Sequence, residues 1–435
     1  MSDNLMADAS GVEKSSKKRR KRTAGSASAV TAESLPKDLR RFALVEDFNP
    51  LSPPQVMAYL KAKGYKIPLD RKTLKPTSNK ETLSKLGATY QDPVLWETLD
   101  ARKLSKAAGY LTDAIVGRDG RIHSTFTFAP DTGRLASFRP NVQNVPRTVD
   151  QAIVQAIRST IIPSEGCEFV ELDWKAIEAV LTGWFANDQD YIALSLADSH
   201  SYYGWHIMYA MREEWARDVG SPPPMADRLL SSRLDDWKRK HGGWQPLLSQ
   251  GVTLNIRDLA KKVNHASSYG MGPKHMGEIL RLSPFLAAKL LRIKDEMAPK
   301  VKAWKRTVLV QAHTQGYLEN PFGYRHCFWN VVEVKGGKPS VSEEANKAFA
   351  FLPQSTAAAM LREVLLDLPA LAGYHEWWWP LCPIHDAILV EVKKEKIDES
   401  VDFIRRVMER KWRELGGLSV PVDAKLGHGS WATVG

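Results

Sequence analysis

Apolar residues recur at three-and-four spacing over much of the chain, which is the period of an amphipathic helix. This spacing predicts short helices in residues 54–63, 81–86, 94–109, 355–368 and 398–413. A longer helical stretch is expected over residues 206–345, with loops at the polar residues 221–225 and at Gly242 and Gly243. The pattern therefore predicts a small helical unit near the start and a large helical insertion in the middle of the chain.

Strand patterns lie on either side of that insertion. Residues 121–128 (RIHSTFTF) alternate like a strand, and residues 168–173 (EFVELD) form an apolar run that ends in an acid. Residues 381–392 have the pattern of a hairpin, and a closing strand is expected near residue 435. The sheet is therefore split in sequence, and the fold class that follows is α+β.

The composition is that of a soluble globular protein. The 435 residues allow roughly two or three domains at about 150 residues each. Hydrophobic residues make up 43% and charged residues 26% of the chain, which excludes a mostly disordered or fibrous protein. The sequence has no secretion signal and no run of about 18 apolar residues, so neither secretion nor a membrane partner is expected.

The chain is basic. Lysine and arginine number 61 against 50 acidic residues, a net charge of +11 that favours a polyanionic partner. Residues 1–45 are expected to form a disordered basic tail and lead-in, which contains the run KKRRKR at residues 17–22. That run fits a nuclear address, a nucleic-acid-binding arm or a solvated tail, and the sequence leaves all three open.

Several familiar motifs are absent from the sequence. There is no GxxxxGK[ST] loop, no GxGxxG after a strand and no HExxH, which excludes nucleotide hydrolysis by a P-loop. The three cysteines are far apart and form no CxxC pair, which argues against a disulfide framework or a structural zinc site. Any catalytic residues must therefore lie in segments without these motifs.

Two aspartates stand where a sheet would meet solvent. Asp173 ends the strand 168–173, and Asp386 lies in the hairpin-like segment. If neighbouring strands bring the two carboxylates within about 4 Å, their repulsion costs about 4 kcal/mol at an effective dielectric of about 20. Divalent cations such as Mg²⁺ compensate that repulsion and can clamp both oxygens of a phosphoryl displacement. The alternative is that each aspartate only caps a turn or helix at a strand end.

A charged and aromatic stripe is expected in residues 255–270. Side chains spaced by four lie on one face of a helix, and the four at this spacing are Arg257, Lys261, His265 and Tyr269. Like charges at this spacing weaken a helix by about 0.2–0.5 kcal/mol, so an anion across the stripe would stabilise it. A triphosphate would pair with the cations, and a base could stack on the rings. A solvated basic face is the alternative.

Taken together in this order, these segments resemble family A DNA polymerases, the group of bacterial polymerase I and phage replicative enzymes. The resemblance covers nearly everything from Asn49 to Gly435. The strings that carry it are TGRLAS at 132–137, PNVQNVPR at 140–147, DWKAIE at 173–178 for motif A, residues 257–270 for motif B, and HDA at 385–387 for motif C. Smaller matches are DSH at 198–200, GYLE at 316–319 and QSTAA at 354–358.

The resemblance implies a right-hand polymerase with a helical thumb, an antiparallel-sheet palm and helical fingers. The expected divisions are the tail at 1–45, the thumb at 46–115, the palm at 116–205 and 350–435, and the fingers at 206–349. About 45 residues before the thumb are too few for a proofreading exonuclease domain of ordinary size, so none is expected.

The resemblance also implies roles for individual residues. Asp173 and Asp386 would hold two Mg²⁺ ions, which Mn²⁺ could replace, with the main-chain carbonyl of Trp174 as a further ligand. Lys261 would protonate the pyrophosphate leaving group. The nucleotide-binding residues would be Arg257, Lys261, His265, Tyr269, Glu178 and His200. Those that contact primer and template would be Arg134, Gln143, Asn144, Arg147, Gln354 and His385.

Glu178, His265 and Ala387 bear on how such a site would work. Glu178 occupies the family's steric-gate position, where it would exclude a ribose 2′-hydroxyl. His265 stands where the family usually has Phe or Tyr, and Ala387 stands where it usually has Glu. Because both metal-binding aspartates are retained, catalysis is expected.

The implied function is template-directed addition of dNTPs to a primer 3′-hydroxyl in DNA replication or repair, without intrinsic proofreading. The expected partners are primer–template DNA and dNTPs, with a separate exonuclease or processivity factor as a further candidate, and the protein is expected to be a monomer. It would act in the cytoplasm of a bacterial or phage-infected cell, with nuclear targeting left open. Two alternatives remain: a catalytically weak DNA-binding homologue, and a single-subunit RNA polymerase.

Overall fold

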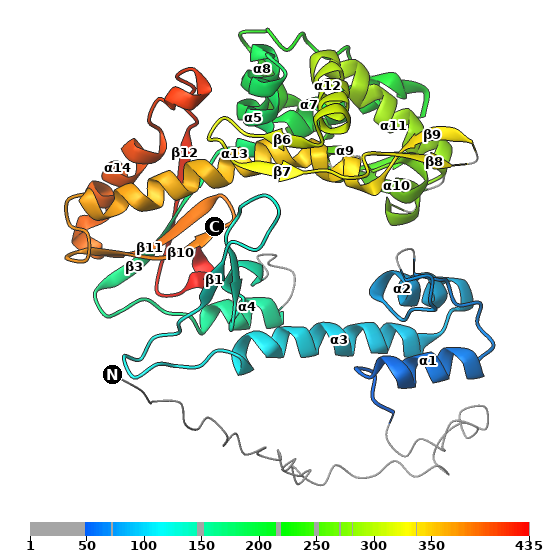
Figure 1. Cartoon of the computed structure of the whole chain (residues 1–435), viewed down its shortest axis with the longest axis horizontal. Coiled ribbons are helices and arrows are strands. Elements are labelled where there is room, and N and C mark those ends of the chain that lie inside the picture. The colour runs from blue at the N-terminus through cyan, green and yellow to red at the C-terminus, as the bar shows by residue number, and fades with distance from the viewer. Residues whose placement is uncertain are drawn as a thin grey trace, which may run out of the picture. The chain divides into compact units, whose positions relative to one another are not determined.

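The computed structural model describes residues 48–434 apart from short gaps at 71–72, 146–151, 215–218, 248–251, 269–270, 281 and 336 (Figure 1). The expected basic tail, Arg147 and Tyr269 lie outside the described residues. The chain divides into two compact units, Met1–Ser105 and Lys106–Gly435. Each unit has its own hydrophobic core.

The first unit is helical, as its apolar spacing predicts. Its helices are α1 (Pro53–Ala62), α2 (Lys80–Tyr90) and the first part of α3 (Pro93–Thr112). Their buried faces meet in a core that contains Val56, Leu60, Leu83 and Leu95, which are fully buried. Asn79 caps α2 by accepting a hydrogen bond from the Thr82 amide, which satisfies one of the helix's unpaired N–H groups.

The second unit is built on a four-stranded antiparallel sheet with the order β10-β11-β3-β12 (Figure 1). Its strands are β3 (Cys167–Trp174), β10 (Trp378–Ile384), β11 (Ala387–Lys393) and β12 (Val422–Gly427). The sheet thus joins segments from both sides of the helical insertion, which confirms the expectation of a sheet split in sequence. Its mixed helix-and-sheet architecture also confirms the α+β class.

Helices cover one face of this sheet. Leu172 on β3 and Ile388 on β11 point toward Met360 and Ile404, and all four side chains are buried in one core cluster. The covering helices are α5 (Ile177–Phe185), α13 (Glu343–Asp367) and α14 (Ile397–Met408). On the opposite face, Phe169 packs in a second cluster with residues that include Ile157 of α4 (Ala152–Ser159). Both faces are covered, so most positions of β3 and β11 are buried, including the acids Glu168, Glu171 and Glu391.

The middle of the chain is a helical body, as expected. Its helices are α6 (Gln189–Ala197), α7 (Ser199–Ala210), α8 (Leu230–His241), α9 (Ile256–Ser268), α10 (Pro273–Leu280), α11 (Pro284–Met297) and α12 (Pro299–Gln315). Tyr203, Ile256, Val263 and Leu290 lie in its core and are fully buried. The long helix α13 contacts α12 and α5, and so connects this body with the sheet (Figure 1).

The second unit also contains short two-stranded hairpins. They are β1 (Thr125–Thr127) with β2 (Ala136–Phe138), β4 (Trp244–Leu247) with β5 (Val252–Asn255), β6 (Tyr317–Glu319) with β7 (Arg325–Cys327), and β8 (Val332–Lys335) with β9 (Lys338–Val341). The strand expected over 121–128 is therefore shorter than the pattern suggested. Within the part of the chain that the structure describes, no helix is long and apolar enough to cross a membrane.

Candidate functional site

The two aspartates singled out in the sequence lie at the same edge of the sheet. Asp173 on β3 pairs in register with Ala387 on β11, and Ile384 on β10 pairs with the same alanine. His385 and Asp386 therefore form the turn of the β10–β11 hairpin, directly beside the end of β3. His385 has a φ of +57°, a left-handed conformation that is uncommon for a residue other than glycine. The register, rather than the sequence, brings Asp386 next to Asp173.

Arg134 supplies a positive charge to this edge of the sheet. Its Nη2 atom lies 3.0 Å from Oδ1 and 3.1 Å from Oδ2 of Asp386. The same nitrogen also donates to Oε1 of Glu178, at the start of α5. One guanidinium therefore bridges a carboxylate expected to bind metal and the carboxylate expected to act as the steric gate. The expected contact of Arg134 with DNA stays a prediction.

The charges of this cluster shift one another's pKa. Burial raises the pKa of Asp386, and the negative charge of Glu178 adds to that effect, whereas Arg134 opposes it. Burial alone would lower the pKa of Arg134, but the two carboxylates outweigh it and raise the pKa of this guanidinium. Arg134 is thus held as a cation between two acids, in line with the cost of placing like charges close together.

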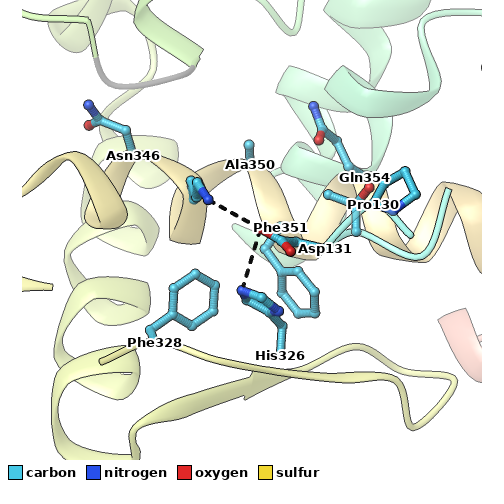
Figure 2. A pocket seen from close by; sticks show the side chains of 10 residues that line it. Pro130, Asp131, His326, Phe328, Asn346, Ala350, Phe351 and Gln354 are labelled. Carbon is cyan, nitrogen blue, oxygen red and sulfur yellow. Dashed lines mark hydrogen bonds and ion pairs between the residues drawn. The ribbon is translucent and has the colours of Figure 1, made fainter. Parts of the chain in front are cut away.

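The loop that carries Arg134 is fastened to α13. Arg362 on α13 donates from Nη1 to the Gly133 carbonyl at 3.2 Å, and Lys347 on the same helix pairs with Asp131 at 3.2 Å. Asp131 lines a cavity of about 360 Å³, and His326 lies 3.9 Å from its carboxylate. Figure 2 shows both side chains beside Phe351. Gln354 lines the same cavity. The position of Arg134 therefore depends on α13 as well as on its own loop.

The oxygen donors at this edge suit a hard divalent cation. Asp173 and Asp386 offer carboxylates, and such ions also accept main-chain carbonyls, water and phosphate oxygens as ligands. Among the described residues, no group of three or more His, Cys, Asp or Glu side chains could hold a metal ion. A cation bound here would therefore need ligands from main chain, solvent or substrate in addition to the two aspartates.

A third carboxylate close to this edge was missed by the sequence analysis. Asp423 on β12 pairs in register with Asp173, on the side of β3 opposite Ala387, and its side chain is exposed. Residues directly opposite each other in antiparallel strands point to the same face. The signal in the sequence was a polar residue inside the closing strand, but its partner could be named only once the pairing of β12 with β3 was known.

The expected stripe lies along α9. Arg257, Lys261 and His265 are all on this helix, and both Lys261 and His265 are exposed. Arg257 donates from Nε to Asp198 at 3.1 Å and to the Ser201 hydroxyl at 3.2 Å. These bonds connect the first turn of α9 with the first turn of α7. The helical stripe is therefore confirmed for its first three members.

Two histidines from different helices face each other beside the stripe. The ring centroids of His200 on α7 and His265 on α9 are 5.4 Å apart. Asn264 places its Nδ2 atom 3.3 Å from Nδ1 of His200. Burial lowers the pKa of His200 to about 4, helped by nearby positive charges on His265, Arg257 and Lys261. The imidazole of His200 is therefore neutral at pH 7.

Charges on the sheet edge and on α9 act on each other. Burial and Lys261 lower the pKa of His265, and the negative charge of Glu178 opposes this shift. Glu178 is also bound by Arg134, which in turn holds Asp386. Acids on the sheet and cations on the helix thus face a common region, as a site for a polyanion with bound cations requires.

The remaining residues expected to contact DNA have internal partners or lie near the site. Gln143 is buried: its Oε1 accepts from the Ser137 amide at 2.9 Å and its Nε2 donates to the Pro383 carbonyl at 3.0 Å. Asn144 is exposed, and His385 is in the hairpin turn beside Asp386. Gln143 therefore ties the loop after β2 to the strand that leads into the turn, and the contacts with DNA stay predictions.

Comparison with known proteins gives a consistent result. The family model of DNA polymerase family A matches residues 20–214 and 230–433. DNA polymerase I of Thermus thermophilus is 26% identical over 344 residues, which are 78% of this chain and 36% of the relative. DNA polymerase I of Deinococcus radiodurans is 25% identical over 394 residues, 88% of this chain and 36% of the relative. The chain thus spans about a third of the length of these curated relatives.

A solved structure has a similar fold. The polymerase domain of Pol1 from M. smegmatis, in complex with DNA primer-template and dNTP, aligns with a TM-score of 0.68. The alignment covers 89% of this chain and 62% of that chain, with 23% sequence identity. At that identity the likeness concerns the fold.

Proposed function

The chain belongs to DNA polymerase family A, and on that basis we propose that it is a template-directed DNA polymerase, which adds dNTPs to a primer 3′-hydroxyl and releases pyrophosphate. The observation that carries the proposal is the register of β3 with β11, because it places Asp386 beside Asp173. Two carboxylates at one sheet edge, opposite a cationic helix, are suited to phosphoryl transfer.

The thumb, palm and fingers of a polymerase can be assigned to segments of this chain. We assign the thumb to residues 46–115, the palm to 116–205 and 350–435, and the fingers to 206–349. The four-stranded sheet lies wholly within the two palm segments, and α9 lies within the fingers segment. The boundaries at 205 and 349 fall within α7 and α13, and the two acids and the cationic stripe come from different parts.

Asp173 and Asp386, with the main-chain carbonyl of Trp174, would hold two Mg²⁺ ions, for which Mn²⁺ could substitute. When bound, such ions would lower the pKa of the primer hydroxyl and neutralise charge on the α-phosphate. The Asp386 carboxylate would then need to be released from Arg134. Arg134, once released, can contact the minor-groove edge of the primer end, with Gln143, Asn144, Arg147, Gln354 and His385 as the other DNA contacts.

The nucleotide is held from the side of α9. Arg257 and Lys261 bind the triphosphate, and Lys261 protonates the leaving pyrophosphate. His200 is neutral, and if the Asn264 amide donates to its Nδ1 atom, the ring proton lies on Nε2 and is available to a phosphate oxygen. His265 and Tyr269 flank the nucleoside, and Glu178 closes the space that a ribose 2′-hydroxyl would need.

The test is primer extension with Mg²⁺, comparing dNTPs with rNTPs on a DNA template. We expect the wild-type protein to extend with dNTPs, and Asp386→Asn to lower the rate roughly a thousandfold or more, because a carboxylate that stabilises transferred charge is lost. Asp402→Asn, an exposed carboxylate on α14, serves as the matched control. DNA binding without extension would indicate a weak homologue, and preferred use of rNTPs would indicate an RNA polymerase.

The proposal includes synthesis without proofreading by this chain. It rests on the assignment of the described residues to the thumb, palm and fingers, none of which is proposed to hydrolyse DNA. A primer with a mismatched 3′ end, incubated with Mg²⁺ and no dNTP, should stay intact. Shortening of that primer by the purified protein would contradict this part of the proposal.

A further inference from the structure

A buried lysine and a half-buried lysine contact the carboxyl end of α9. Lys294 on α11 donates from Nζ to the Asn264 carbonyl at 3.0 Å and to the Ser267 hydroxyl at 2.5 Å. Lys305 on α12 donates to the Ser267 carbonyl at 2.9 Å. The last carbonyls of a helix lack partners within the helix and carry partial negative charge, so cations stabilise this end. The carboxyl end of the stripe helix is therefore held from two neighbouring helices.

Lys294 is an unusual residue for this place. Lys294 is only 8% exposed, and the other buried residues of α11 are apolar. Burial lowers the pKa of Lys294 well below its ordinary value, and the charge of Lys305 adds to that effect, whereas Asp295 opposes it. An apolar side chain at this position would avoid the free-energy cost of burying a charged amine. Packing alone therefore gives no reason for a lysine here.

The contacts of Lys294 lead to the nucleotide side of α9. Asn264, whose carbonyl accepts from Lys294, places its side-chain amide on Nδ1 of His200. His265, the next residue, faces the His200 ring. A change in the position of the Asn264 main chain would therefore move both imidazoles.

The other end of α9 is held by Arg257, through Asp198 and Ser201 of α7. Tyr203 of the same helix donates to the Leu290 carbonyl of α11 at 2.6 Å, so α7 and α11 are tied to each other as well. The carboxyl end of α9 is held separately from these contacts, by Lys294 and Lys305.

We propose that Lys294 is a positioning residue for nucleotide binding: it fixes the last turn of α9 and, through Asn264, directs the Nε2 proton of His200 toward the phosphates. Lys305 supports the same turn through Ser267. This inference rests on the proposed polymerase function, because it assigns a purpose to the geometry of the nucleotide site.

The first test is Lys294→Met, which keeps the length of the side chain and removes its donors. We expect the KM for dNTP to rise by roughly three- to tenfold, the effect of one lost hydrogen bond, with the Kd for primer–template unchanged. Thermal stability should stay the same or increase, because an apolar side chain replaces a buried amine while Ser267 still donates to the Asn264 carbonyl at 3.0 Å. Lys289→Met, on the same helix and partly exposed, is the control.

Opposite changes in stability and nucleotide affinity separate positioning from a general loss of structure. Lys294→Gln, which keeps a neutral donor, should restore most of the dNTP affinity. In a double-mutant cycle, Asn264→Ala should add little to Lys294→Met, because both act on His200. A Lys294→Met protein that unfolds, keeps the wild-type KM, or adds fully to Asn264→Ala would overturn the proposal.

The second test does not need polymerase activity. In protein with labelled histidines, the His200 ring resonance, assigned with His200→Gln, should shift in Lys294→Met and stay in place in Lys289→Met. If the wild-type protein extends no primer but this shift is seen, the proposed function fails and the contact pathway stands. If primers are extended and the shift is absent, the pathway fails alone.

Discussion

Arg134 pairs with two carboxylates through one guanidinium, at 3.0 Å from Asp386 and in contact with Glu178. Such an arrangement is favourable because each acid has an opposite charge in contact, which offsets part of the repulsion between the two acids. A cation in this place also repels any other cation that approaches Asp386. We therefore expect Arg134 to oppose the binding of a divalent ion at Asp386.

This repulsion can be measured. We expect Arg134→Met to bind Mn²⁺ roughly tenfold more tightly than the wild type in the absence of DNA, because a fixed positive charge has been removed from beside Asp386. Isothermal titration calorimetry gives the Kd directly. Arg292→Met removes an exposed arginine on α11 and should leave the Kd unchanged. Weaker Mn²⁺ binding in Arg134→Met would show that Arg134 organises the carboxylates instead.

Glu178 gives a second prediction at this scale. We expect Glu178→Ala to reduce discrimination against ribonucleotides by roughly a hundredfold, because the space for a 2′-hydroxyl opens. The measurement is kcat/KM for a dNTP and the matching rNTP, with Glu395→Ala as an exposed acidic control. If the mutant and the wild type discriminate equally between the dNTP and the rNTP, Glu178 is not the steric gate.

At the scale of elements, α9 is the part most closely fixed by polar contacts. Arg257 binds at its amino end, and Lys294 and Lys305 bind at its carboxyl end. Its apolar face, with Ile256 and Val263, is fully buried in the helical core. The exposed face is then held at a defined position, which a helix that grips a triphosphate requires.

The buried Lys294 makes a prediction for the pH dependence of stability. Its folded pKa lies well below the ordinary 10.5 because of burial and the repulsion of Lys305, with Asp295 opposing. Above about pH 10.5 the amine is neutral in both states. Below that pH the unfolded chain binds a proton that the folded chain lacks, so the free energy of unfolding falls until the folded pKa is passed.

The wild type should therefore gain stability relative to Lys294→Met as the pH rises from the folded pKa of Lys294 toward about 10.5. Urea denaturation of both proteins from pH 7 to 10.5 measures the difference, in which the titration of all other groups largely cancels. A difference that stays constant over this range would show that Lys294 has an ordinary pKa in the folded protein.

At the scale of the whole molecule, the excess of 61 basic over 50 acidic residues gives a net charge of +11. If the protein neutralises about six to ten phosphates, the affinity for primer–template should drop by about 10³ to 10⁵ between 50 and 200 mM salt. Fluorescence anisotropy with a labelled duplex measures the slope of log Kd against log salt. A flat response would contradict electrostatic binding of DNA.

The elements that could be predicted are those whose own sequence contains the signal. The helix expected at 54–63 is α1, and the strand 168–173 is β3, because each has a clear period and a buried face. The hairpin of β4 and β5 lies where the sequence predicts helix, because Pro246 interrupts the alternation of its first strand. The helix expected at 355–368 begins instead at Glu343 and contains Pro353, a residue that usually ends a helix.

The family resemblance, the split sheet and the helical stripe of Arg257, Lys261 and His265 can be read from the sequence, because periodicity and short motifs are local properties of a chain. Which side chains share a site becomes visible only in the folded protein. Asp423 opposite Asp173, Arg134 on Asp386, and Lys294 under α9 are contacts between distant segments. Strand register and helix packing set such contacts, and neither is written in any single stretch of sequence.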